Sequence, residues 1–310
     1  MPELVKVTKK NSISREWKKN KYLYIMILPV IIYYFIFCYM PMFGAVIAFK
    51  DYKPALGIFE SKWVGFQWFI TFFKDYSFIR ILKNTVLLSL YSILWGFPAP
   101  IIFALFLNEL HSNLYKRTIQ TVTYLPHFIS VVVVCGLLTQ FLNSEGVISN
   151  IVAIFTGSSE NLLVNPKNFR TIYIASDIWQ GVGYGSIIYL SALAGIDQEM
   201  YEAATIDGAS RFRKILSITL PCLMPTIVIM FILRMGSLMS IGYEKVMLLY
   251  SPLTYETADI ISTFVYRVGI LEGTQFSYST AIGLFNSVIN LIMVLLSNKF
   301  SKKFTGSGLF

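Results

Sequence analysis

Long apolar stretches recur along the chain, separated by shorter polar connections. A helix needs about 20 predominantly apolar residues to cross roughly 30 Å of hydrocarbon, and each stretch has about that length or more. The pattern therefore predicts an all-α, polytopic membrane protein. Its six transmembrane helices are expected at about residues 22–48, 84–108, 119–142, 171–194, 219–242 and 276–297.

The same pattern predicts three parts: a basic N-terminus (1–21), a transmembrane domain (22–298) and a short tail (299–310). An even number of spans places both termini on one side of the membrane. Positive residues that flank a membrane helix are usually retained in the cytoplasm, so both termini are expected there. The outer connection 50–83 also carries lysines, but long loops follow this rule less strictly.

Prolines interrupt several of the expected spans. A proline inside a helix frees a backbone carbonyl, and in a membrane this is tolerated only where neighbouring groups or a cavity satisfy it. The pattern favours a packed bundle that moves or encloses a pathway over a simple anchor. The prolines concerned are Pro29, Pro41, Pro98, Pro100, Pro126, Pro221 and Pro225.

The connection 144–170 contains a short apolar stretch, Val147 to Phe155, bounded by Gly146 and Gly157. This stretch is too short to cross a bilayer. It is interpreted either as an amphipathic lid or docking element that lies against the bundle, or as an ordinary surface loop packed on its own side chains.

Composition agrees with a membrane protein, because 55% of the 310 residues are hydrophobic and 14% are charged. Soluble domains carry about 25% charged residues. The net charge of +9 could suggest nucleic-acid binding, but positive charge directly before an apolar stretch is typical of a topology signal. The densest basic cluster is Lys6, Lys9, Lys10, Arg15, Lys18, Lys19 and Lys21.

The cysteines and histidines do not suggest a metal site. Cys38, Cys135 and Cys222 are far apart in apolar segments, and only His111 and His127 could assist them. Free thiols that pack as small hydrophobic side chains are the expected state.

The connection 195–220 is the long polar loop on the side of the termini, and its sequence predicts two short helices joined by a bend. Asp197 can cap the first helix, and Gly208 can end it in a left-handed conformation. Ser210 can cap the second helix, whose basic residues precede Pro221 and the fifth span.

The spacing in this loop resembles the EAA loop of binding-protein-dependent ABC importers: Glu202-Ala203-Ala204, then Gly208, then Ile218-x-Leu220-Pro221. The resemblance implies the type I importer permease fold, called MetI-like. It also implies that the loop forms a coupling helix that docks into a groove on a cytoplasmic ATPase. The implied coupling residues are Glu202, Ala203, Ala204, Asp207, Gly208, Ile218, Leu220 and Pro221.

Three further stretches resemble the LplB-type branch of sugar permeases. They read ILPVIIYYFIFCYMPMFGAVIAFKDY, GYEKVMLLYSPLTYETADIISTFVYRVGI and FSYSTAIGLFNSVINLIMVLLSNKFS. The resemblance implies import of an oligo- or polysaccharide across the bacterial cell membrane by alternating access. It implies a second homologous permease as heterodimer partner, two ATPase subunits and an extracellular solute-binding lipoprotein.

No G-x-x-x-x-G-K-[ST] sequence occurs, so the chain lacks the usual loop that cradles ATP phosphates. The chain is therefore expected to be no enzyme, with no catalytic residue, metal or cofactor of its own. ATP and Mg are expected on the partner ATPase subunits.

Two other functions find less support in the sequence. Residues 181–185 read GVGYG, which resembles a potassium-channel filter, but they lie in the middle of an expected span, where close helix packing or a locally loosened helix is favoured. A membrane enzyme of lipid or glycan metabolism lacks support, because no Ser/His/Asp set, HExxH sequence or pair of inward carboxylates is evident.

Polar residues within the spans are candidates for the substrate pathway. Arg234 lies in an expected span and should face the bundle or a wet cavity, since a charge in lipid costs at least about 2.5 kcal/mol. Such side chains could bind sugar hydroxyls, or they could hydrogen-bond between helices, and both interpretations stay open. The set is Asp177, Gln180, Tyr184, Arg234, Ser237, Asn286 and Asn290.

Overall fold

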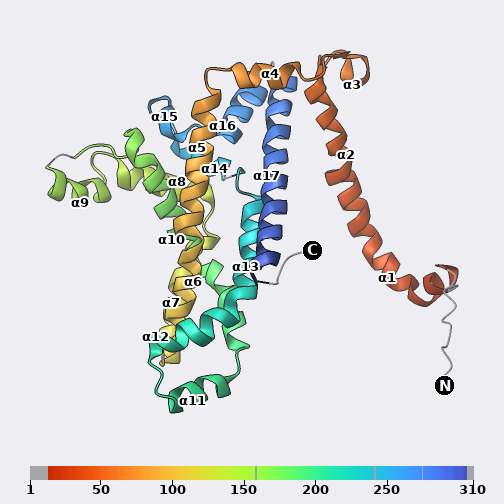
Figure 1. The fold of residues 1–310 in the computed structure, drawn as a ribbon. Helices are drawn as coiled ribbons and strands as arrows, with labels where there is room; N and C mark the ends of the chain where they lie inside the picture. Colours follow the sequence, from red (N-terminus) through yellow and green to blue (C-terminus); the bar gives the residue numbers. More distant parts are fainter. Residues whose placement is uncertain (1–12, 158, 241, 274, 306–310) are drawn as a thin grey trace.

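The computed structural model describes residues 13–157, 159–240, 242–273 and 275–305. Most of the predicted basic N-terminus (1–12) and the end of the predicted tail (306–310) lie outside the described residues. The described chain is almost entirely helical (Figure 1), as the apolar pattern predicts.

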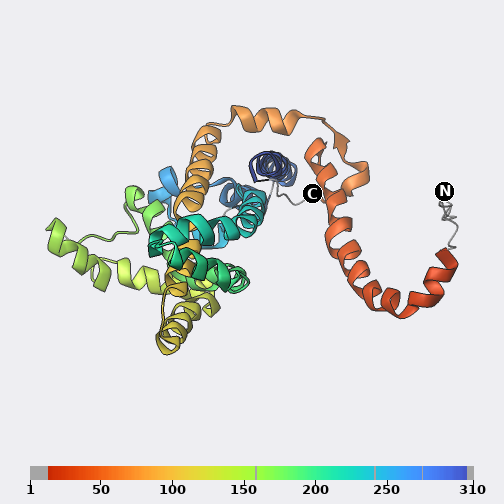
Figure 2. The same ribbon diagram turned by 60° about the horizontal axis from the view of Figure 1, so that its bottom comes forward.

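The N-terminal arm leaves the helix bundle. Its middle diverges from the bundle in two views 60° apart (Figures 1 and 2), and no residue in its most apolar window is buried. Only its last part returns to the bundle, where η2 packs against α17. The arm consists of α1 (Ile13–Tyr34), η1 (Phe35–Tyr39), α2 (Met40–Met42) and η2 (Phe43–Phe49).

A short crossing segment connects the arm to the bundle at one end of the molecule, here called the α3–α4 end (Figure 1). Two short strands pair antiparallel, with Lys50 opposite Trp63 and Asp51 opposite Lys62. The elements of this segment are β1 (Lys50–Asp51), α3 (Gly57–Glu60), β2 (Lys62–Trp63) and α4 (Gln67–Lys74).

The bundle is formed by the remaining elements, and α10 lies at its centre, packed against α6, α7 and α13. These elements are α5 (Phe78–Tyr91), η3 (Ser92–Gly96), α6 (Pro98–Asn108), α7 (Asn113–Tyr124), η4 (Leu125–Phe128), α8 (Val131–Leu142), α9 (Val147–Thr156), α10 (Pro166–Ala194), α11 (Gln198–Ile206), α12 (Arg211–Lys214), η5 (Ile215–Thr219), α13 (Leu220–Gly236), α14 (Tyr243–Leu249), η6 (Pro252–Thr254), α15 (Tyr255–Ala258), α16 (Ile261–Tyr266), η7 (Arg267–Leu271) and α17 (Phe276–Thr305).

Among the described residues, five stretches are long and apolar enough to cross a membrane: Asn20–Phe49, Phe78–Asn108, Val131–Thr156, Arg211–Gly236 and Phe276–Lys303. The expected span 171–194 lies in α10. This helix has 29 residues, but it is not among the five stretches because it is less apolar. The expected span 119–142 is not one helix, because η4 separates α7 from α8.

Three prolines are accommodated by wide turns rather than by breaks. A proline ring clashes with the carbonyl four residues earlier, and a π turn relieves this clash by shifting the hydrogen bond to the carbonyl five residues earlier. Such turns (η1, η3 and η5) end two residues before Pro41, Pro98 and Pro221. The bonds run from the Met40 amide to Phe35, from the Phe97 amide to Ser92 and from the Leu220 amide to Ile215.

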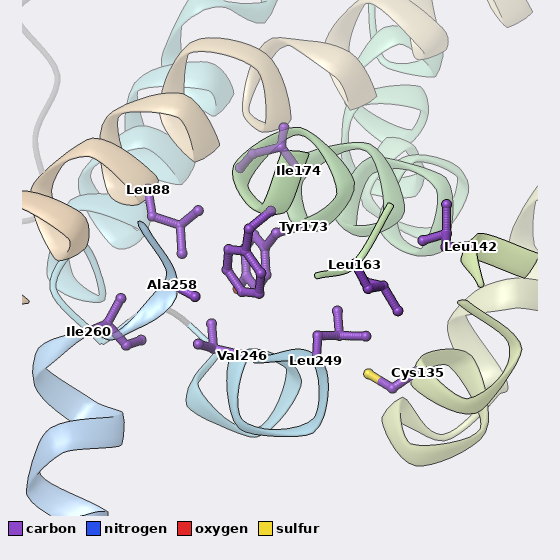
Figure 3. Packing of buried hydrophobic residues seen from close by; sticks show 11 residues of the cluster. Leu88, Cys135, Leu142, Leu163, Tyr173, Ile174, Val246, Leu249, Ala258 and Ile260 are labelled. Atoms are coloured by element: carbon purple, nitrogen blue, oxygen red, sulfur yellow. The ribbon is translucent and has the colours of Figure 1, made fainter. Parts of the chain in front are cut away.

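The buried core is divided along the bundle. One cluster joins α5, α8, α10 and α14 around Tyr173, Val246 and Leu249 (Figure 3). Another lies near the opposite end, where Leu193 and Leu223 pack together between α6, α10 and α13. Because this second cluster adjoins the connection 195–220, it fixes the base of that loop.

A buried charge network lies between the first part of α5 and the chain around α16. Asp259 is fully buried, and its Oδ2 atom lies 2.8 Å from a nitrogen of Arg267 and 3.3 Å from a nitrogen of Arg80. Burial alone would lower the pKa of the Arg267 guanidinium, but its hydrogen bonds to Asp259 outweigh this effect and raise that pKa. Asp259 therefore holds two arginines in place.

Candidate coupling surface and transport pathway

The connection 195–220 forms the two capped helices that the sequence predicts. The Asp197 carboxylate accepts a hydrogen bond from the Glu199 amide at 3.0 Å, and the Ser210 hydroxyl accepts one from the Arg213 amide at 3.4 Å. Gly208 follows α11 with φ of +73°, a conformation that side chains disfavour. These three predictions are confirmed, and α11 lies at the end of the bundle opposite α3 and α4 (Figure 1).

Helix α11 is attached to the base of the bundle by polar and apolar contacts. The hydroxyls of Tyr201 and Thr219 lie 3.0 Å apart, and Lys214 Nζ donates to Thr205 Oγ1 at 2.7 Å. Tyr201 and Ile218 also pack against the cluster that contains Leu223. These contacts connect α11 to η5 and α13.

The outward surface of α11 and α12 is partly apolar. Ile206 is 87% exposed and Phe212 is 69% exposed, and Met200 is exposed as well. Nothing lies within 4 Å of a Cβ placed on Gly208, so the backbone there is accessible. These exposed apolar side chains are available for contact with a partner.

The predicted coupling residues divide into two groups by exposure. Ala204, Ile218 and Leu220 are half-buried, so they contribute mainly to the attachment of the loop. The others are exposed and available to a partner: Glu202, Ala203, Asp207, Gly208 and Pro221.

Three predicted pathway residues line one cavity. Asp177, Arg234 and Ser237 surround a space of about 370 Å³ between α10, α13 and the η3–α6 region. Arg234 donates a hydrogen bond to Ser92 Oγ, and Lys245 Nζ lies 3.9 Å from Asp177 Oδ1. Burial lowers the pKa of the Lys245 ammonium, whereas the Asp177 charge opposes that shift.

Two other predicted pathway residues form hydrogen bonds between elements. Asn290 Oδ1 accepts from the Met239 amide and its Nδ2 donates to Ser240 Oγ, both at 2.9 Å. Gln180 Nε2 donates to the Ile129 carbonyl at 3.1 Å. Each of these two side chains thus binds a connection next to its helix rather than another helix, and their place in a pathway stays a prediction.

The last two predicted residues do not line this cavity. Asn286 is buried in α17. Tyr184 stacks on His127, with ring centroids 3.8 Å apart and planes at 3°. His127 was not among the predicted pathway residues, although it is a polar residue directly after Pro126 in an expected span.

The GVGYG sequence serves helix packing. Helix α10 is continuous through residues 181–185, and a Cβ on Gly183 would lie 2.2 Å from the Thr123 carbonyl oxygen. A Cβ on Gly185 would lie 3.2 Å from the side chain of Pro100. The arrangement does not favour an ion channel, because a filter needs a non-helical re-entrant segment with its carbonyls exposed.

Comparisons with known proteins agree with these features. Residues 96–305 match the family described as "Binding-protein-dependent transport system inner membrane component". Protein LplB of Bacillus subtilis (strain 168) is 45% identical over 94% of this chain and 92% of its own length. The polygalacturonan/rhamnogalacturonan transport system permease protein YteP of the same organism is 44% identical over 94% of this chain and 91% of its own length.

A chain of similar structure occurs in the crystal structure of a bacterial ABC transporter involved in import of the acidic polysaccharide alginate. It is 44% identical, with a TM-score of 0.87 over 94% of this chain and 99% of that chain. A second structure of a bacterial alginate transporter, in complex with an alginate pentasaccharide-bound periplasmic protein, matches with a TM-score of 0.88, 44% identity and coverage of 96% and 99%. The chain is thus a multi-pass plasma-membrane protein that belongs to the inner membrane components of binding-protein-dependent transport systems, as an ABC sugar permease of the LplB type.

Proposed function

We propose that this permease forms one half of the pathway of an ATP-driven importer of oligo- or polysaccharides and couples to a separate ATPase through α11. The observation that carries the proposal is the exposed apolar surface of α11 and α12, attached to the base of α13. ATP-driven closure of the ATPase subunits would move α11, and α13 with it, between outward and inward openings. ATP and Mg would bind to the ATPase subunits.

The N-terminal arm supports a second permease subunit as the partner. Its apolar stretch, Asn20–Phe49, has no buried residue in its most apolar window, and its middle diverges from the bundle (Figure 2). Van der Waals packing drives helix association in lipid, so an apolar arm that is free of its own bundle is suited to pack on another. A homologous permease, as in a heterodimer, supplies such a bundle.

The substrate proposal rests on the relatives and on the cavity. LplB-type relatives include permeases named for polygalacturonan and alginate, which carry carboxylates. In this chain the cavity is lined by Arg234 and one carboxylate, with Lys245 close by, so the local charge suits an anion. Acidic oligosaccharides, delivered by an extracellular binding lipoprotein, are the first substrates to test.

The proposed orientation places α11 and both termini in the cytoplasm. The basic residues before the first span and those at the end of α17, Lys302 and Lys303, favour this side. The α3–α4 end would then face outward, toward the binding protein.

Purification of the tagged chain from its native host in mild detergent tests the coupling site. An ATPase and a second permease are expected to co-purify with the wild type. Gly208→Asp places a charged side chain on the accessible backbone of the docking surface, so ATPase recovery is expected to fall at least tenfold. Mass spectrometry of the purified complexes measures this.

Gly57→Asp is the matched control. Gly57 has φ of +69° and also has open space around its Cβ position, but it lies at the α3–α4 end. Backbone strain is therefore similar in both variants, about 1–2 kcal/mol, and only the docking surface differs. Equal recovery of the ATPase in the two variants would contradict docking through Gly208.

A further inference from the structure

Residues 50–83 carry an excess of positive charge that neither the coupling surface nor the cavity uses. Lys50 donates to two backbone carbonyls, and Arg80 pairs with Asp259. This stretch lies at the end opposite α11, where positive charge is not expected from the preference for the cytoplasmic side. Its exposed charged residues are Glu60 against Lys53, Lys62, Lys74 and Lys83.

Helix α4, within this stretch, has three different faces. One face packs against α17, where the rings of Trp68 and Phe72 each lie 6.3 Å from the ring of Tyr278. The other two faces are exposed, and helical spacing separates them into an apolar stripe and a polar stripe. The apolar stripe is Phe66, Ile70 and Phe73, and the polar stripe is Gln67, Thr71 and Lys74.

The depth of α4 follows from its packing against α17. Helix α17 has 30 residues. It is therefore about 45 Å long, the thickness of a bilayer with its headgroups. Tyr278 belongs to the first turn of α17, so it lies near the headgroups. Helix α4 lies across this end of α17, at the margin of the molecule in both views (Figures 1 and 2). It is therefore expected at the boundary between hydrocarbon and water.

The apolar stripe of α4 faces the hydrocarbon side of this boundary. The ring of Phe73 lies 5.5 Å from that of Phe285, which is deeper in α17 than Tyr278. Phe66 and Ile70 continue this side of the helix and are 67% and 53% exposed. An amphipathic helix that lies in the interface has this arrangement, with apolar side chains toward the acyl chains and polar ones toward the headgroups.

The two stripes meet in a shallow hollow of about 350 Å³. The hollow is lined by Val64, Phe66, Gln67, Ile70, Thr71 and Lys74. It thus places an ammonium group and a side-chain amide next to apolar side chains. A phospholipid has the complementary chemistry, because its phosphate is anionic and its acyl chains are apolar.

We propose that α4 is an interfacial helix that binds an anionic phospholipid, with the phosphate at Lys74 and Gln67 and the acyl chains against Phe66 and Ile70. In the proposed orientation this lipid belongs to the outer leaflet. The excess of exposed lysines around α4 favours an anionic headgroup over a zwitterionic one. The site is independent of the ATPase and of the transported substrate.

Photo-cross-linking tests the lipid site directly. The tagged chain, purified with the subunits that bind it, is reconstituted with phosphatidylglycerol that carries a photoreactive group in one acyl chain. Peptide mass spectrometry is expected to find the cross-link within residues 64–74. Lys74→Ala is expected to lower its yield about fivefold, the effect of one lysine near a charged membrane surface.

Lys53→Ala is the matched control. Lys53 is also an exposed lysine of this stretch, but it does not line the hollow, so the yield is expected to stay within about twofold of the wild type. Phosphatidylcholine with the same photoreactive chain is expected to give a low yield in all three proteins. Equal yields with the two lipids, or no effect of Lys74→Ala, would overturn the anionic lipid site.

Spin labelling tests the depth of α4 without a choice of lipid. In a background in which Cys38, Cys135 and Cys222 are replaced with alanine, nitroxide labels are attached at Ile70→Cys and at Thr71→Cys. The first label is expected to be relaxed mainly by oxygen, which partitions into hydrocarbon. The second is expected to be relaxed mainly by a water-soluble nickel chelate.

The outcomes distinguish a lipid from a protein neighbour. Equal exposure of the two labels to the nickel chelate would show that α4 lies in water, and shielding of Ile70→Cys from both reagents would show that a protein covers it. Either result overturns the proposal. Neither measurement requires ATPase recovery or uptake, so the lipid site stands or fails separately from the proposed function.

Discussion

Replacement of Asp259 with alanine is expected to destabilise the protein by about 3–5 kcal/mol, because it leaves Arg267 and Arg80 without their shared counter-ion. Asp259 is fully buried, and its Oδ1 atom also accepts from Thr263 Oγ1 at 3.0 Å. Thermal denaturation in detergent measures the effect, and the midpoint is expected to fall by about 10 °C.

Asp259 belongs to a wider hydrogen-bond network, which explains why the removal of one carboxylate is expected to cause a large loss of stability. Its backbone carbonyl accepts from Asn84 Nδ2 at 3.1 Å, and Asn84 Oδ1 accepts from Arg170 at 2.8 Å. Loss of the carboxylate therefore disturbs the junction of α5, α10 and α16 as well as one ion pair.

Two further variants test this explanation. Glu272→Ala removes an exposed carboxylate and is expected to change stability by no more than about 0.5 kcal/mol. Adding Arg267→Met to Asp259→Ala removes the more buried of the two unpaired charges and is expected to restore part of the loss. A double variant as unstable as the sum of the single variants would show that the ion pair is not the cause.

Gly183→Ala is expected to lower the free energy of unfolding by about 1–3 kcal/mol. The added Cβ would lie 2.2 Å from the Thr123 carbonyl oxygen, which is backbone and cannot rotate away. Helices α7 and α10 would have to separate. Thermal denaturation and the yield of monodisperse protein both report this change.

Gly181→Ala is a matched control in the same GVGYG sequence. No atom lies within 4 Å of a Cβ on Gly181. Alanine is favoured over glycine inside a helix by about 1 kcal/mol, so this variant is expected to be as stable as the wild type or more so. Equal destabilisation by both substitutions would contradict the packing role of Gly183.

Local features of the coupling loop could be predicted from the sequence because their signals are local. Asp197, Gly208 and Ser210 cap or end helices through bonds to residues two or three positions away, or through their own backbone angle. The EAA spacing then gave these helices a proposed function. The apolar stretches likewise predicted most helices of the bundle, because length and apolarity are also local properties of the sequence.

Features that depend on distant contacts could not be predicted from the sequence. Asp259 and Arg80 are 179 residues apart in the sequence. No sequence pattern around either residue indicates that the two side chains form an ion pair. Among the pathway candidates, Asn290 is engaged by Met239 and Ser240, while Arg234 lines a cavity, yet both are simply polar residues in apolar stretches. Only the three-dimensional packing separates these roles.

The free N-terminal arm also bears on how the protein is produced in the cell. A newly inserted copy exposes the most apolar part of this arm to the bilayer until the proposed second permease covers it. Because a bound partner stabilises a folded chain by mass action, the amount of this chain is expected to depend on the supply of the proposed partner permease.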